Sequence, residues 1–186
     1  IPHVAVIRFH TRVPVAAPER VGPGLVTALE SETALYVVIH ANHPRELTPN
    51  CRAACARMIR AGIPLLAQTV LMRGVNDEAA TLEALFRGLV AMRVKPYYLH
   101  HLDLAVGTSH FRTTLGAGQA LMRDLRGRLS GLCQPTYVLD IPGGYGKVPV
   151  GPSYAYASES GWRVDGPDGS AHSYPPVPVN TSSRAG

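Results

Sequence analysis

The sequence is poor in several residue types whose abundance would identify a class of protein. Its 186 residues include three cysteines, one tryptophan and two lysines. Three cysteines cannot form a disulfide framework, and their odd number favours a reducing compartment, by default the cytoplasm. No apolar run reaches the roughly 18 residues that a membrane span requires, so no membrane partner is expected. Residues 1–14 lack the basic start and apolar stretch of a signal peptide and are typical of a chain entered in mid-fold.

Acidic residues are also in the minority. The chain has 13 acidic and 18 basic residues, a net charge of +5 and a pI near 9.4. A basic balance can indicate nucleic-acid binding, but the 16 arginines are scattered from Arg8 to Arg184 and form no block. We therefore expect a solvated surface with a few anion-binding arginines, and no nucleic-acid partner. Apolar residues make up 46% of the chain, which argues against disorder.

Short apolar runs alternate with helical patterns along the first 150 residues. The runs occupy residues 3–7, 34–39, 67–72, 95–99 and 135–139, and Leu82, Leu85, Phe86, Leu89 and Val90 repeat between them with helical spacing. Thr48, Pro49 and Gly62 have the types expected at the start and end of a further helix. This alternation predicts an α/β fold with a parallel sheet. Five units are too few to close an eight-stranded barrel, so the sheet is either open or part of a barrel.

The pattern changes after about residue 150. The segments SYAYA, GWRVD and SAHSY, separated by GPDG-type turns, predict short antiparallel strands within residues 151–174. Residues 175–186 have almost no large apolar side chain and are predicted to be disordered. The expected organisation is therefore an α/β part over residues 1–150, a β extension over 151–174 and a tail over 175–186.

Unusual polar residues follow each predicted strand. They are Arg8 and Arg12, the HANHP segment at 40–44, the RGVND segment at 73–77, the HHLD segment at 100–103 and the segment from Asp140 to Lys147, while Gln68 lies within the third strand. Ligands bind at the carboxyl ends of parallel strands, so these loops predict a site. Asn76 and Asp77 are better explained as helix caps than as ligands. Any single histidine is more often structural, and no spacing supports a metal site.

Two short motifs fail a specific test. An iron–sulfur motif C-x3-C-x2-C starting at Cys51 and Cys55 would need a third cysteine where Met58 stands, so these cysteines are expected in the core. The PGGYGKVP segment lacks the glycine and the Ser or Thr of a phosphate-binding loop. What remains is Lys147 on a predicted glycine-rich turn, where a desolvated amine could form an imine with an aldehyde.

Five stretches, taken in order, are specific to one family. They are TRVPV at 11–15, HANHPRE at 40–46, AGIPLLAQTVLMRGVND at 61–77, RVKPYYLHHLDLAVGTSHFRT at 93–113 and SGLCQPTYVLDIPGGYGKVPVGPSY at 130–154. With a weaker match to about residue 175, they cover about 160 of the 186 residues. The sequence therefore resembles the lysine 2,3-aminomutase family of radical S-adenosylmethionine (SAM) enzymes.

The resemblance implies a fold, three cofactors and a set of site residues. The fold is a partial (β/α) barrel, incomplete here at its N-terminal side, with a short antiparallel C-terminal extension. The cofactors are a [4Fe-4S] cluster, SAM and pyridoxal 5'-phosphate (PLP). Lys147 matches the catalytic lysine that holds PLP as an internal aldimine, and Asp103 and Asp140 match the carboxylates that bind the far amino group of the substrate. His40 and Gln68 match positions near SAM.

The implied reaction is the interconversion of L-lysine and β-lysine by a SAM-derived radical, with L-lysine as the small-molecule partner. The family's three-cysteine cluster motif, its N-terminal arginines and its cysteine-rich zinc and dimer-contact segment are absent, so the chain resembles only the C-terminal portion. No metal ligand is assigned, the isolated chain is expected to be inactive, and a homo-oligomer stays open. Two alternatives also stay open. They are a β-lysine-forming enzyme for elongation factor P modification, and a truncated, non-catalytic fragment.

Overall fold

The computed structural model describes residues 3–159 and 161–176 and divides the chain into two compact units. The first unit is Ile1–Gly151 and the second is Pro152–Gly186. Of the tail predicted to be disordered, residues 177–186 lie outside the described residues. Among the residues described, no helix combines the length and the apolar character needed to cross a bilayer.

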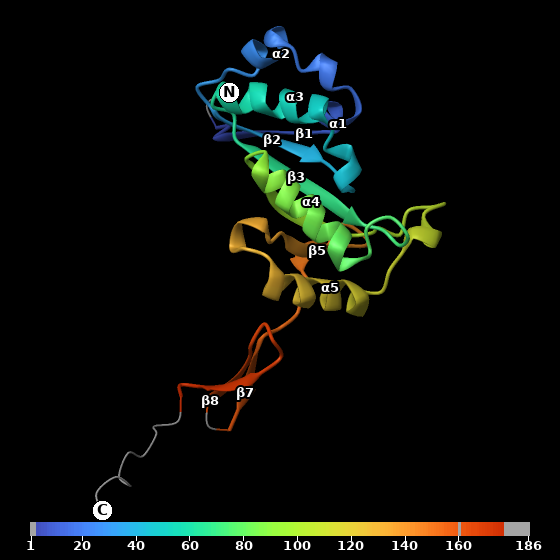
Figure 1. Cartoon of the computed structure of the whole chain (residues 1–186), viewed down its shortest axis with the longest axis vertical. Coiled ribbons are helices and arrows are strands. Elements are labelled where there is room, and N and C mark those ends of the chain that lie inside the picture. Colours follow the sequence, from blue (N-terminus) through green and yellow to red (C-terminus); the bar gives the residue numbers. More distant parts are fainter. Residues whose placement is uncertain (1–2, 160, 177–186) are drawn as a thin grey trace, which may run out of the picture. The chain divides into compact units, whose positions relative to one another are not determined.

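A six-stranded sheet organises the first unit (Figure 1). Its strands lie side by side in chain order, the first five parallel and the last antiparallel to its neighbour. They are β1 (Val6–Thr11), β2 (Ala34–His40), β3 (Leu65–Leu71), β4 (Val94–His101), β5 (Thr136–Ile141) and β6 (Gly146–Pro149). The α-helices are α1 (Val13–Ala16), α2 (Pro23–Ala28), α3 (Pro49–Arg60), α4 (Ala79–Ala91) and α5 (Leu115–Arg128), and the 3-10 turns are η1 (Pro18–Arg20), η2 (Pro44–Glu46), η3 (Ser109–Phe111) and η4 (Gly131–Cys133). This curled half-barrel confirms the predicted fold class.

The helices form as their end signals predict. Thr48 accepts a hydrogen bond from the backbone N–H of Cys51 at 3.2 Å and so caps α3. Gly62, with φ of +79°, turns the chain after the helix. Cys51, Cys55 and Met58 are fully or almost fully buried, which confirms their place in the core.

One apolar core joins the helices to one face of the sheet. Of the five periodic residues of α4, Val90 is partly buried, and the other four, Leu82, Leu85, Phe86 and Leu89, are completely buried. Along β3 buried and partly exposed residues alternate without interruption, so one face packs against helices and the other does not. Gln68 lies on the less covered face, and this face therefore remains accessible for a site.

Three sequence predictions placed a strand or a site residue at the wrong position in the fold. The first strand is β1 at residues 6–11 and not the apolar run 3–7, because pairing with β2 along Val6–Thr11 sets its limits. His40, His100 and Asp140 lie within the last residues of their strands and not after them. Lys147 lies in β6 and not on a turn, because Gly143 and Gly144, with φ of +92° and +80°, reverse the chain first.

The second unit contains a three-stranded antiparallel sheet, as predicted. Its strands are β7 (Ala155–Ser158), β8 (Gly161–Asp165) and β9 (Ala171–Tyr174), in the order β7-β8-β9. Trp162 stands opposite Ala157 on one side and Tyr174 on the other. Gly166 and Ser170 close the turn between β8 and β9 by a backbone hydrogen bond of 2.6 Å.

Candidate functional site

Asp140 and Lys147 face each other across the β5–β6 hairpin. They are directly opposite in the antiparallel register, and the Lys147 Nζ donates to both carboxylate oxygens of Asp140. The hydrogen bond from Lys147 is the main reason that the pKa of Asp140 is lowered from its ordinary value, and a bond from His100 acts in the same direction. Residues directly opposite on one face of a hairpin are the closest cross-strand neighbours, so this pairing follows from the register.

His100, near the end of β4, completes a group of three polar side chains. Its Nδ1 lies 3.2 Å from Asp140 Oδ2 and 3.3 Å from Lys147 Nζ. Burial lowers the pKa of His100 and the charge of Lys147 lowers it further, against the opposing effect of Asp140. Its Nε2 is buried and has no hydrogen-bond partner among the described residues. We call His100, Asp140 and Lys147 the amine triad.

An open hollow of about 380 Å³ lies beside the amine triad. Its lining includes Asp103, Asp140, Gly144 and Lys147. The structure thus brings together the two aspartates and the lysine that the resemblance singles out. Asp103 has no ion-pair partner among the described residues, and its charge raises the pKa of both His100 and His101.

A second polar group joins three neighbouring strands. His40 and Gln68 are opposite each other in the β2–β3 register, and Gln68 Nε2 lies 3.5 Å from His40 Nδ1. Gln68 Oε1 lies 3.0 Å from Nδ1 of His10 on β1. Burial lowers the pKa of His40, followed by the effects of His10, Arg12 and His100. The two residues matched to positions near SAM therefore do meet, and His40 also has a buried Nε2 without a partner among the described residues.

Sequence reasoning missed three residues that belong to these groups. His10 contacts Gln68, His100 completes the amine triad, and the Tyr98 ring lies with its centroid 5.6 Å from Lys147 Nζ. The signal for Tyr98 and His100 was present, because residues two apart on a strand share a face. His10 could not be found in this way, since the first strand was predicted too early in the chain.

Other polar residues near the strand ends are structural. His101 is buried, and its Nδ1 lies 2.7 Å from the Tyr137 hydroxyl. Asn76 donates to the carbonyls of Asn42 and Val70, both at 2.8 Å. The prediction that Asn76 and Asp77 cap a helix is wrong. The residue at the start of α4 is Glu78, which makes no side-chain cap bond, while Asp77 accepts from the Gly74 N–H within a turn.

The described residues do not supply the ligands of an iron–sulfur cluster. No group of three or more His, Cys, Asp or Glu side chains suited to a metal ion occurs among them. The hydrogen bond with Cys51 and burial raise the pKa of Cys55, which disfavours its thiolate form. All three cysteines are buried.

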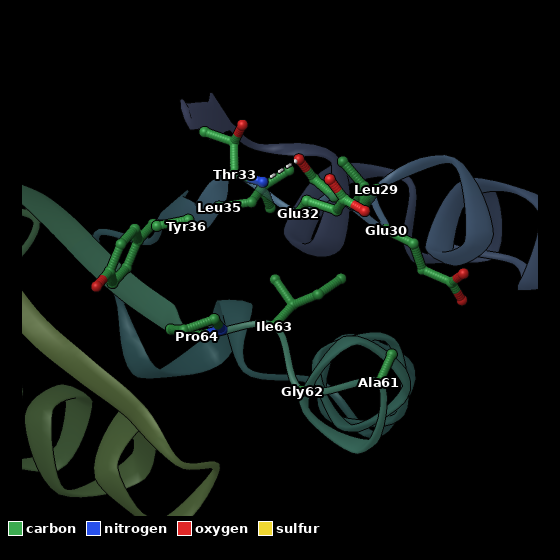
Figure 2. Close-up of a pocket in the computed structure, with 12 residues that line it drawn as sticks. Leu29, Glu30, Glu32, Thr33, Leu35, Tyr36, Ala61, Gly62, Ile63 and Pro64 are labelled. Atoms are coloured by element: carbon green, nitrogen blue, oxygen red, sulfur yellow. Dashed lines mark hydrogen bonds between the residues drawn. The ribbon is translucent and has the colours of Figure 1, made fainter. Parts of the chain in front are cut away.

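A second hollow, of about 400 Å³, lies at the other end of the strands, next to the starts of β2 and β3 (Figure 2). Its lining includes Leu35, Ile63 and Pro64, and the side chains of Thr33 and Glu30 point away from Ile63 (Figure 2). The hydrogen bond drawn there joins the Thr33 N–H to the Ser31 hydroxyl at 3.1 Å. No set of charged groups converges on this hollow, so the amine triad and the hollow beside it form the candidate site.

Known proteins share much of this sequence. The family described as Lysine-2,3-aminomutase matches residues 122–169. The L-lysine 2,3-aminomutase of Fusobacterium nucleatum is 45% identical over 164 residues, which cover 88% of this chain and 38% of that protein. For the L-lysine 2,3-aminomutase of Acetoanaerobium sticklandii the identity is 47% over 154 residues, covering 83% and 37%. The glutamate 2,3-aminomutase of Clostridioides difficile is 38% identical over 154 residues, covering 83% and 36%.

The chain spans well under half the length of these relatives. Among solved structures, a radical SAM methyltransferase from Sphaerobacter thermophilus matches with a TM-score of 0.50 and 21% identity, over 63% of this chain and 37% of that one. At this identity the likeness shows the fold alone.

Proposed function

This chain corresponds to a C-terminal portion of the lysine 2,3-aminomutases, and we propose that it forms the amine-binding part of an enzyme that interconverts L-lysine and β-lysine. The observation that carries the proposal is the meeting of Asp103, Asp140 and Lys147 at one hollow. Two carboxylates there favour a cation, and the ε-ammonium of lysine is a cation of suitable size.

The site has the donor set that PLP requires for covalent attachment. PLP is an aldehyde, and the amine of Lys147 lines the open hollow, where a Cβ added at Gly144 or Gly146 would have nothing within 4 Å. When bound, PLP supplies an electron sink that delocalises an unpaired electron on the substrate. Lys147 would hold the cofactor through its Nζ, near the start of β6.

Asp140 and Lys147 can fill their two proposed roles only one after the other. In the structure the Lys147 ammonium forms an ion pair with the carboxylate of Asp140. Once Nζ is bonded to an aldehyde it no longer presents three N–H donors, so Asp140 becomes available to the ε-ammonium of lysine. The ammonium of Lys147 thus stands where we expect the substrate's ammonium, with Asp103 as the second carboxylate of the hollow.

We include SAM in the proposal, with His40 and Gln68 as the residues that lie near it. These side chains meet on the less covered face of the sheet, and His40 keeps a buried Nε2 that can bond a polar ligand atom. The [4Fe-4S] cluster and the radical mechanism rest on the resemblance and on the relatives' names. Because the described residues include no ligand set for a cluster, we derive no step through it.

Borohydride trapping tests the cofactor assignment. The full chain is mixed with PLP, reduced with sodium borohydride, digested and mapped by mass spectrometry. We expect the pyridoxyl group on Lys147. The chain offers one internal control, because its other lysine, Lys95, donates to the carbonyls of Leu132 and Gln134, both at 2.9 Å. Labelling of Lys95 in place of Lys147 would refute the assignment.

Substrate competition tests the choice of lysine over glutamate. We expect lysine to bind to the PLP-loaded protein more tightly than glutamate or norleucine, since norleucine has the same chain but no ε-ammonium. Equal binding of lysine and norleucine would remove the role of the two carboxylates. Turnover of lysine would also exclude the reading of this chain as part of a non-catalytic protein, while a requirement for elongation factor P would favour the branch that serves its modification.

A further inference from the structure

The amine triad contains one group that the proposed function has not used. His100 Nδ1 is in hydrogen-bond range of the Lys147 Nζ, at 3.3 Å, and of Asp140 Oδ2, at 3.2 Å. The side chain of His100 is 15% exposed, so bulk water has little access to it. The three groups come from three strands, β4, β5 and β6. Their meeting is therefore a property of the fold and not of one loop.

The protonation states of the amine triad follow from these contacts. Burial lowers the pKa of His100, so the imidazole is neutral near pH 7. Nδ1 of a neutral His100 can donate to Asp140 or accept from Lys147, and the tautomer with its proton on Nε2 presents the lone pair to the ammonium. The Lys147 ammonium then donates both to this lone pair and to the Asp140 carboxylate. It is the bridge that lets two acceptors lie 3.2 Å apart.

We propose that His100 is the base that takes the proton which Lys147 must lose before Nζ can bond an aldehyde. This inference rests on the proposed function, since it concerns the same lysine. In the step an N–H bond of the ammonium breaks, its electron pair stays on Nζ, and the proton bonds to Nδ1. The free amine then attacks the aldehyde carbon, whose oxygen leaves later as water.

The charges of the amine triad support this transfer. Before it, Asp140 is negative, Lys147 positive and His100 neutral, whereas after it Lys147 is neutral and His100 positive. The new Nδ1–H points at Asp140 Oδ2, so the carboxylate that held the ammonium now holds the imidazolium. The net charge is unchanged, and the proton moves over a single contact of 3.3 Å.

Other groups near Lys147 are less suited to act as this base. Asp140 keeps its carboxylate form, because the hydrogen bond from Lys147 lowers its pKa, and it serves as the partner of whichever group carries the positive charge. Tyr98 presents its ring to the amine, with the centroid 5.6 Å away. Asp103 acts on His100 only through its charge, and His40 makes no direct contact with Lys147 among the described residues. His100 is the one group with both a neutral lone pair and direct contact among those that the structure describes.

The rate of PLP capture tests the inference. The probe is PLP itself, added to the full chain, with capture followed by absorbance and its site mapped after borohydride reduction. The test variant is His100→Asn, because an Asn oxygen can replace Nδ1 as an acceptor but cannot keep a proton. The matched control is His101→Asn, on the next residue of the same strand, where the Asn oxygen can still accept from the Tyr137 hydroxyl.

We expect His100→Asn to slow capture at pH 7.5 by at least about tenfold, within the range of general-base effects, with the final extent of labelling unchanged. The pH profile gives a second signature. Wild-type capture should change less with pH between 7 and 8.5 than capture by the variant, because its proton acceptor is part of the site. Capture by the variant should rise more steeply with pH, because the proton of Lys147 then has to be lost to water.

Each result bears on the inference. Unchanged rate and pH profile in His100→Asn, with PLP still on Lys147, would overturn the role of His100 and leave the proposed function standing. Capture on Lys95 alone in the wild type would overturn both. Circular dichroism of each variant reports whether it folds. His100→Gln is the second variant for the same comparison if His100→Asn does not.

Discussion

Gly118 lies directly against the ring of Tyr137, so that a Cβ added to it would stand 2.1 Å from the Tyr137 hydroxyl oxygen. The glycine is in α5 and the tyrosine in β5, and both are buried. The same hydroxyl is 2.7 Å from His101 Nδ1. This close approach therefore fixes how α5 packs against the strand that carries Asp140.

The first prediction concerns this contact. Gly118→Ala should lower the free energy of unfolding by about 1–3 kcal/mol, because the tyrosine ring has to move in a packed core. Gly116→Ala is the control in the same helix. A Cβ there meets nothing within 4 Å, so the change should be neutral or stabilise by up to about 1 kcal/mol. Urea unfolding of both variants measures the difference, and equal effects would contradict the prediction.

The second prediction concerns the buried amide of Asn76, which is 1% exposed. Its Nδ2 donates two hydrogen bonds, and its Oδ1 accepts from the Met72 N–H at 2.7 Å. Asn76→Asp replaces both donors by a charged acceptor of the same shape, so it should cost about 3 kcal/mol or more. The neighbouring change Asp77→Asn keeps the acceptor for Gly74 N–H and should cost less than about 1 kcal/mol. Equal losses of stability in urea would show that the buried network has no special role.

The third prediction concerns substrate binding. Asp103→Asn and Asp140→Asn should each weaken lysine binding by roughly 10- to 150-fold, the equivalent of a lost hydrogen bond to a charged group. Asp124→Asn serves as the control, because Asp124 pairs with Arg128 on the surface of α5. Calorimetric titration of the PLP-loaded protein with lysine measures the change. The role would be refuted if both single variants bound lysine as well as the control.

The fourth prediction concerns pH. Burial is the first cause of the lowered pKa of His40, His100 and His101, so the unfolded chain binds protons more readily than the folded one. Their contribution to stability is present above about pH 6.5 and is lost as the pH falls through the lowered values. Asp140 acts in a separate window, below its ordinary pKa of 3.8. Urea midpoints should therefore be lower at pH 5.5 than at pH 7.5, and His100→Asn should reduce that difference.

The fifth prediction concerns iron. The three cysteines of the chain are buried, and the described residues form no ligand group. The isolated chain should therefore stay colourless after anaerobic reconstitution with iron and sulfide, and inactive toward SAM and lysine. About four irons per chain together with β-lysine formation would contradict this prediction.

Periodicity and end signals were sufficient to predict most of the fold. The helix after Thr48 begins where its cap residue predicts, and four of the five residues of the apolar repeat of α4 are completely buried. The start of β1 could not be found in this way. An edge strand is limited by its hydrogen bonds to a neighbour, and β1 is mostly exposed, so its own apolar pattern is weak.

The site was predictable in its residue types but not in its contacts. Strand ends indicated where polar residues gather, and Asp103, Asp140 and Lys147 do share one hollow. The bond between Asp140 and Lys147 depends on a two-glycine reversal that places Lys147 in register, which no periodicity in four residues can show. For His100, as for any single histidine, the sequence favoured a structural explanation, and only its neighbours across the sheet place it in the amine triad.

The separation along the chain of the members of the amine triad has a consequence for folding. Asp140 and Lys147 are seven residues apart, and hairpins of this kind form within about 1–10 μs. His100 lies 40 residues before Asp140 and can join only when β4 and β5 have paired across α5. During synthesis and refolding Lys147 can therefore pair with Asp140 early, whereas His100 joins them late. The complete amine triad is therefore a property of the assembled sheet and not of the hairpin alone.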